Sequence, residues 1–283
     1  MAGAATPPLA WYDPPADLAA YVQSFVRRDE RPEAQVVRIL PEPRTSIQVM
    51  AAAPYWLRAR DAAAPWRRLP RVALWGPQHN WGYGYAGGHV RAFGALLTPA
   101  GFAALLKRPA WALVDAVAPV AEVDAGLGAA LEPRGDEPFE AWLERAVPAL
   151  RAAFAGTATD DPLPGALGLF ATAEDDAIGA AARAAGLSER QFRRVFRDRH
   201  GVAPKRYQRA LRVDRMLRQL HARPWELDGH PDHPIAFADQ PHAIREFKAL
   251  TGLTPLQYAR AKANGDAAIR SVAAPGVTGP VED

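Results

Sequence analysis

The chain has 283 residues and a net charge of +3 at pH 7, and 49% of its residues are hydrophobic and 23% charged. It is long enough for two domains of ordinary size, and its composition is globular rather than disordered. Because it contains no cysteine, disulfides, thiolate metal sites and cysteine nucleophiles are excluded, which fits a cytoplasmic protein.

The first residues, MAGAATPPLAWYDPP, lack the basic region and apolar core of a secretory signal. No stretch of about 18 apolar residues follows, so a membrane span is not predicted. Residues 9–123 contain short apolar runs between turns such as PEPRT and NWGYGYAGG, which are rich in Pro, Gly and Arg. Five of these runs are predicted to be strands: QVVRIL, SIQVMAA, YWLRAR, VALWGP and VRAFGALL.

Two helices are expected after these strands. The first runs from Thr98 to Pro109, with Thr98 as its N-cap and Pro99 at its first position. The second runs from Pro138 to Phe154 and gathers aromatic and aliphatic residues on one face. We expect a homodimer that pairs through this second helix or through a sheet edge, because twofold pairing is common among soluble proteins.

Four aromatic residues of this first half are candidates for lining a small apolar effector pocket: Trp75, Trp81, Tyr83 and Tyr85. Plain core packing around a sheet explains them equally well. His79 and His89 flank the glycine-rich stretch and could face one another, yet no third metal ligand is evident. There is also no Ser/His/Asp pattern, no GxGxxG and no phosphate-binding loop, so no catalytic residue, metal or cofactor is predicted.

After a linker predicted at DDPLPGALG, residues 160–168, the charge of the chain changes. Between Leu187 and Arg218 there are 11 Arg or Lys and three acids, a balance of +8, so the remainder carries −5. Such a basic block is typical of a surface that binds a phosphate backbone. The alternative is a solvated helix face in an arginine-rich chain.

The basic block begins with a predicted helix-turn-helix. DDAIGAAARAAGLS, Asp175 to Ser188, favours a helix that ends in a turn at Gly186. Ser188 is a good N-cap for a second helix, in which Phe192, Val195 and Phe196 form an apolar stripe. Gly201 follows the last turn, and Pro204 fits the start of the next helix, which runs to about Leu220.

A second copy of this pattern follows at a constant offset of 51 residues. The residues that match are Arg194 and Arg245, Phe196 and Phe247, Gly201 and Gly252, Pro204 and Pro255, and Tyr207 and Tyr258. Asp239 is the expected N-cap of this copy, and Ile244, Phe247 and Leu250 are expected to face inward. Two similar units in one chain can enter successive major grooves, one helical turn or about 34 Å apart.

ADQPHAIREFKALTGLTPLQYAR in the second copy strongly resembles the signature of the AraC/XylS family of bacterial transcription regulators, and GLSERQFRRVFRDRHGVAPKRY resembles the first helix-turn-helix of the same module. The resemblance covers about Ala173 to Lys262. It implies contacts with double-stranded DNA from Arg190, Gln191, Arg193, Arg194 and Arg197 in the first unit, and from Gln240, His242, Ile244 and Arg245 in the second. For each arginine, a plain surface charge is the alternative.

The chain departs from this family between Trp225 and Phe237. The family has a continuous helix there, whereas this chain has ELDGHPDHPIAF, with Gly229, Pro231 and Pro234 inside the span. We expect a broken segment, because an interior proline costs a helix about 3 kcal/mol. The first unit is then expected to dominate sequence reading, and the second to contact mainly backbone. A zinc site at His230, His233 and His242 is not favoured, because no carboxylate pattern accompanies them.

The first half resembles the N-terminal domain of one subgroup of these regulators in PPADLAAYVQSFV, RILPEPRTSIQV, WGPQ and LLTPAGFAALL. By analogy we expect an α+β protein, in which a β-barrel or jelly-roll-like domain with flanking helices precedes an all-α domain of two helix-turn-helix units. The predicted boundaries are a β-rich sensor or dimerisation domain over 1–125, a helical connector and linker over 126–168, the DNA-binding domain over 169–263, and a disordered tail over 264–283.

These features predict a sequence-specific transcription regulator, not an enzyme, that is controlled by a small-molecule effector in the N-terminal domain. RNA polymerase is a further candidate partner of such a regulator. Two alternatives remain open: a small-molecule-binding or metal-dependent enzyme with a vestigial DNA module, and an interaction protein whose DNA module has decayed.

Overall fold

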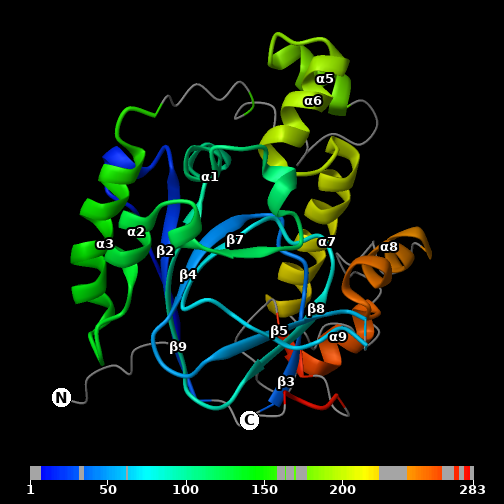
Figure 1. The fold of residues 1–283 in the computed structure, drawn as a ribbon. Coiled ribbons are helices and arrows are strands. Elements are labelled where there is room, and N and C mark those ends of the chain that lie inside the picture. Colours follow the sequence, from blue (N-terminus) through cyan, green and yellow to red (C-terminus); the bar gives the residue numbers. More distant parts are fainter. Residues whose placement is uncertain are drawn as a thin grey trace, which may run out of the picture.

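The computed structural model describes residues 8–31, 35–61, 63–157, 163, 169, 177–222, 241–262, 271–273 and 277–280. Figure 1 shows a β-rich N-terminal part with a helical part at its side. The first sheet has six antiparallel strands in the order β1 (Leu9–Tyr12), β2 (Val22–Glu30), β9 (Val90–Leu97), β4 (Thr45–Met50), β7 (Val72–Trp75) and β10 (Val117–Pro119). The second has five, in the order β11 (Ser271–Ala273), β3 (Gln35–Ile39), β8 (Gly82–Ala86), β5 (Tyr55–Ala59) and β6 (Arg67–Arg68).

The two sheets pack face to face. A small apolar cluster joins Met50 and Trp75 of the first sheet to Ala86 of the second. All five runs predicted to be strands are strands, and the double-sheet, jelly-roll-like fold is confirmed.

Helices cover the outer face of the six-stranded sheet and form the largest core with it (Figure 1). These are α1 (Pro99–Leu106), α2 (Ala125–Leu131) and α3 (Phe139–Phe154), with the short 3-10 helices η1 (Ala16–Leu18), η2 (Ala110–Leu113) and η3 (Val120–Glu122). Thr98 caps α1 as expected, since its side chain accepts a hydrogen bond from Gly101 N.

The apolar face of α3 belongs to this core. The rings of Phe139 and Trp142 lie 5.6 and 5.5 Å from the ring of Phe93 on β9, and Leu150 is fully buried. The expectation that this face mediates a dimer is therefore wrong, because the face is already covered by the chain's own sheet. For the same reason α2 and α3 are part of the first domain's core rather than a separate connector.

β8 lies where the sequence predicts a glycine-rich turn. Its residues pair with β3 on one side and with β5 on the other, so it is a central strand. Gly84 is required there, because a methyl group at this position would overlap the Tyr55 hydroxyl and Ile39. The glycines allow close packing inside the double sheet, and tertiary contacts override the local preference for a turn.

The helical part contains α5 (Ala177–Ala184), α6 (Glu189–His200), α7 (Pro204–Ala222), α8 (Pro241–Thr251) and α9 (Pro255–Lys262). The first helix-turn-helix unit, α5–α6, has Phe192 and Phe196 in its core. In the second unit, α8 and α9 match α6 and the start of α7, and Phe247 and Tyr258 pack with residues of α7. Among the helices that the structure describes, none is long and apolar enough to span a membrane.

Several predictions fall outside the described residues. They are the Pro-containing segment 225–237 with His230 and His233, the N-cap Asp239, the candidate Gln240, and all of the linker 160–168 except Leu163. Leu163 itself is buried in the core of the first unit.

The tail predicted as disordered over 264–283 contains a strand. Ser271–Ala273 pairs antiparallel with β3 at the edge of the five-stranded sheet, with Val272 opposite Arg38. The local composition predicts no structure here, but an edge strand offers free backbone groups that a short segment of any composition can pair with.

Candidate nucleic-acid interface

α6 presents one buried and one charged face. Ser188 and Gln191 form a capping box at its start, in which Ser188 N donates to Gln191 Oε1 at 3.0 Å and the Ser188 hydroxyl accepts from Gln191 N at 3.4 Å. Phe192 and Phe196 are fully buried. The opposite face consequently points outward, and it carries four exposed arginines: Arg190, Arg193, Arg194 and Arg197.

Most of this charge is available to a ligand. Arg193 pairs with Glu189 at 2.8 Å, but both side chains are more than half exposed, so the pair contributes only about 0.3–0.5 kcal/mol. Within the described part of the chain, Arg190, Arg194 and Arg197 have no ion-pair partner. The Gln191 oxygen is occupied in the cap, which leaves its NH₂ group free to donate.

α8 presents fewer cations. His242, Arg245 and Lys248 are exposed, and Ile244 is half-buried. Glu246, next to Arg245, is turned inward and accepts hydrogen bonds from Arg209 Nε at 2.8 Å and from Arg212 Nη2 at 2.8 Å. Burial alone would raise the pKa of the Glu246 carboxyl, but the hydrogen bonds and charges of Arg212 and Arg209 outweigh it and lower the pKa. Glu246 thus anchors α8 to α7.

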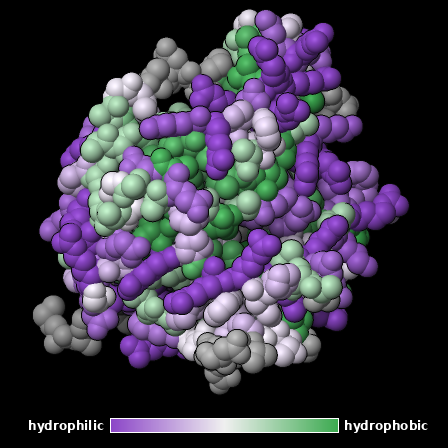
Figure 2. All heavy atoms as spheres, viewed as in Figure 1, coloured by the Kyte–Doolittle hydropathy of each residue, from purple (hydrophilic) through white to green (hydrophobic). Residues whose placement is uncertain are grey.

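The polar surface follows the same elements. Figure 2 shows hydrophilic side chains gathered at the top of the view, over α5 and α6, and at the right edge, over α8. The structure therefore exposes the described DNA-binding candidates on two helices of one module, with the denser charge on α6.

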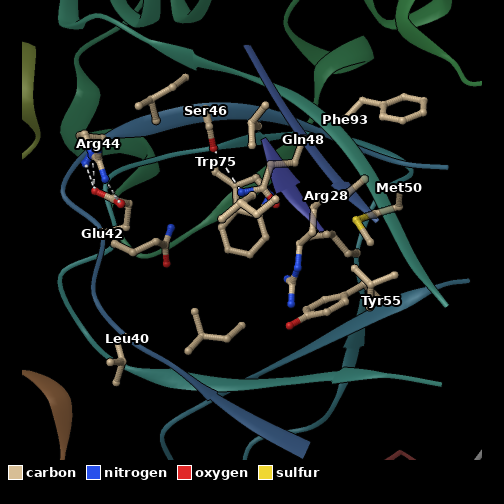
Figure 3. A pocket seen from close by; sticks show the side chains of 18 of the residues that line it. Arg28, Leu40, Glu42, Arg44, Ser46, Gln48, Met50, Tyr55, Trp75 and Phe93 are labelled. Carbon is tan, nitrogen blue, oxygen red and sulfur yellow. Dashed lines mark hydrogen bonds and ion pairs between the residues drawn. The ribbon is translucent and has the colours of Figure 1, made fainter. Parts of the chain in front are cut away.

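A cavity of about 250 Å³ lies between the two sheets (Figure 3). Its walls are mostly apolar, with Leu40, Met50, Trp75 and Phe93 among them. The polar side chains in the wall are Arg28, Glu42, Arg44, Ser46, Gln48, Tyr55 and Gln78. Arg44 and Glu42 neutralise each other through two hydrogen bonds of 2.8 and 2.7 Å. Trp75 Nε1 is buried and has no hydrogen-bond partner among the described residues.

The four aromatic candidates do not share this cavity. Trp75 lines it, whereas Trp81 and Tyr83 border a second hollow beside the β5–β6 hairpin, whose wall also includes Trp75. Tyr85 packs edge-on against Trp66, with ring centroids 6.4 Å apart. Side chains alternate along β8, and because Gly84 and Ala86 face inward, Tyr83 and Tyr85 face outward.

The sequence reasoning missed two sets of residues. Ser46 and Gln48 alternate with buried Ile47 and Val49 on β4, a pattern typical of a strand with one solvent face, yet they line the cavity. His200 is 5% exposed and stacks on Phe196, with ring centroids 4.2 Å apart. Its position four residues after Phe196 places it on the buried stripe and could have revealed it.

His79 and His89 have different partners. His79 is fully buried beside the module, and burial followed by the charge of Arg206 lowers its pKa to about 4. His89 instead pairs with Asp29, at 2.7 Å between Nε2 and Oδ1. No cluster of three or more metal-ligating side chains occurs among the described residues.

Two family models match the chain. Residues 181–261 match a helix-turn-helix domain, and residues 11–119 match a domain of unknown function (DUF6597). Two solved structures, both of ToxT from Vibrio cholerae, share 8% sequence identity with the chain. The 1.65 Å P21 form has a TM-score of 0.45 and covers 83% of this chain and 98% of its own. The structure from strain O395 has a TM-score of 0.44 and covers 84% and 98%.

No curated protein matches the chain. The helix-turn-helix match spans both units described above, from α5 to α9. The chain therefore carries an AraC-type helix-turn-helix domain, the module of DNA-binding transcription regulators, behind a DUF6597 domain.

Proposed function

We propose that this regulator binds its DNA mainly through the exposed face of α6, and that a small apolar molecule in the cavity between the two sheets controls it. The observation that carries the first part is the set of three unpaired arginines on α6, held outward by the buried Phe192 and Phe196. Arginine forks match both guanine edges and phosphates in a major groove. The second unit, with fewer exposed cations, would add mainly backbone contacts.

Salt dependence of DNA binding tests the first part. About six phosphate contacts give a log–log slope of affinity against salt of about −5. A duplex selected from genomic DNA with the purified chain serves as ligand, and fluorescence anisotropy gives the affinity. Each of Arg190→Gln, Arg194→Gln and Arg197→Gln is expected to weaken binding, and a variant that loses a phosphate contact should reduce the slope by about one.

Arg134→Gln is the matched control, because Arg134 is exposed in the loop between α2 and α3, on the far side of the sensor domain from α6 (Figure 1). It should leave affinity and slope unchanged. An affinity that does not respond to salt, or equal losses in Arg134→Gln and the α6 variants, would contradict α6 as the contact surface.

A stability measurement tests whether the cavity between the sheets binds an effector. A ligand that binds only the folded chain raises its stability by about 2.7 kcal/mol at 100 times its dissociation constant. Compounds from a metabolite panel that raise the melting temperature are then tested on Ala92→Ile, which adds bulk to the cavity wall. They should lose their effect on this variant, while its circular dichroism stays that of the wild type. An equal shift in both proteins would place the ligand elsewhere.

A homodimer and a contact with RNA polymerase stay predictions. Sedimentation of the purified chain at tens of micromolar tests the first, and a monomer there would remove it.

A further inference from the structure

A hollow of about 770 Å³ lies beside the β5–β6 hairpin, and its wall also includes Trp75 and Val117 of the six-stranded sheet. Four arginines line it: Arg58, Arg60, Arg67 and Arg68. Among the described residues none of the four has an ion-pair partner. The cavity between the sheets adjoins this hollow at Trp75, but its own two arginines are paired with Glu30 and Glu42. The two spaces therefore offer different chemistry, one apolar and one cationic.

The acids in the wall do not neutralise the arginines. Asp115 accepts hydrogen bonds from the backbone N–H groups of His79 at 2.6 Å and Asn80 at 2.9 Å, and from the Asn80 amide at 2.7 Å. Asp61 accepts from Ala63 N at 3.0 Å. Both carboxylates are thus hydrogen-bonded to nearby backbone N–H groups. Four arginines against two aspartates leave the wall with a net charge of +2.

Arg58 is held in place before any ligand binds. Its guanidinium lies between two rings, 4.8 Å from the centroid of Trp66 and 4.9 Å from that of Tyr83. A guanidinium that is already fixed loses little entropy when it donates to a ligand oxygen.

We propose that this hollow binds a small molecule that carries a phosphate group. A phosphate monoester has a charge of about −1.5 to −2 at pH 7, which matches the net charge of the wall. Its three terminal oxygens offer more acceptor sites to several guanidinium forks than the two oxygens of a carboxylate do. The concave shape suits a small ligand rather than the convex backbone of a duplex.

The hollow is also next to the DNA-binding module. Trp81 borders it and stacks under Arg38, whose Nη1 donates to Thr251 O at the end of α8. A bound phosphate would therefore lie one side chain away from the turn between α8 and α9.

Calorimetric titration of the full chain tests the proposal, with inorganic phosphate and pyrophosphate as probes and sodium acetate at matched ionic strength as the reference anion. We expect saturable binding of both phosphates and none of acetate. Arg58→Gln should weaken phosphate binding at least tenfold, while Arg134→Gln, an exposed arginine outside the hollow, should leave it unchanged.

Because Arg58 is partly buried, its replacement could unfold the hairpin. The double variant Arg67→Gln/Arg68→Gln changes only exposed side chains and should show the same loss with an unchanged melting temperature. Binding that is unsaturable, equal for acetate, or retained in the double variant would overturn the proposal. So would a loss of DNA affinity in the double variant without phosphate present, because the hollow would then hold a DNA backbone.

Discussion

The two helix-turn-helix units follow one sequence pattern but are attached differently to the N-terminal domain. The buried residues in the core of the first unit lie between Leu163 and Tyr207, and the partly buried Val114 of the N-terminal domain packs against them. The core of the second unit itself contains a residue of the N-terminal domain, Leu40, which follows β3 and is 1% exposed. The two units therefore share a sequence pattern and a local fold, but they are attached to the N-terminal domain through different contacts.

Both units also touch the N-terminal domain at the glycine that ends a helix. Gly201 ends α6 with φ at +79°, and a methyl group there would come within 2.5 Å of Val114. Gly252, with φ at +73°, lies against Trp81 and Arg38. Leu40 also lines the cavity between the sheets, so a molecule in that cavity would touch a residue of the second unit's core.

Replacement of Leu40 should give the largest effect, and it tests directly whether the two units are attached differently. Leu40→Ala removes buried contacts with the second unit's core and enlarges the adjoining cavity, which costs about 2–5 kcal/mol of unfolding free energy. Hydrogen exchange should show a loss of protection in α8 and α9 and little change in α5 and α6. Leu127→Ala, in the separate core around α2, is the matched control and should spare both units. Equal loss in the two units would mean that the module responds as one body.

A change of pH should act on the first unit instead. Burial followed by the charge of Arg206 lowers the pKa of His79 to about 4, and burial followed by the charge of Arg199 lowers the pKa of His200 to about 3. Both values lie below the ordinary 6.5, so the unfolded chain binds more protons. The stability that neutral histidines provide is complete above pH 6.5 and falls as the pH drops toward 4.

At pH 5 the expected loss is up to about 2 kcal/mol for each histidine. Urea unfolding between pH 7.5 and 5 measures it, and hydrogen exchange should show α6 opening before α8. His200→Gln should flatten the profile. An unchanged profile in both His200→Gln and His79→Asn would contradict this origin of the pH dependence.

Local sequence rules were enough to predict the helix ends. Ser188, Gly201 and Gly252 occupy the caps that the sequence predicts, because capping depends on a few neighbouring residues. β8 was not predictable in the same way, because its glycines are explained only by the approach of Tyr55 from a neighbouring strand. The strand at Ser271–Ala273 likewise depends on a partner more than 230 residues away in sequence.

The candidate sites also differ in whether local sequence predicts them. The arginines of α6 follow from helical periodicity, which sets one face outward once Phe192 and Phe196 are buried. The cavity and the arginine-lined hollow arise from strands far apart in the chain. No local pattern shows that Ser46 faces a cavity rather than solvent, or that Arg58 lies between Trp66 and Tyr83.

The last comparison is between the matched arginines Arg194 and Arg245, which occupy equivalent positions of α6 and α8. We expect Arg194→Ala to reduce discrimination between the selected duplex and single-base variants by about 1–3 kcal/mol, the worth of one bidentate base contact. Arg245→Ala should instead weaken all duplexes to a similar degree and reduce the salt slope by about one, as loss of a phosphate contact does. Arg194 has three further exposed arginines around it on α6, which would fix the helix in the groove, whereas the exposed cationic neighbours of Arg245 on α8 are Lys248 and, when protonated, His242.

Anisotropy with a panel of mutated duplexes measures both the discrimination and the salt slope. Footprinting should show one groove that tolerates no base change and a second that is protected but tolerant. Equal loss of discrimination in the two variants would show that both units read bases, and the proposed division between them would be wrong.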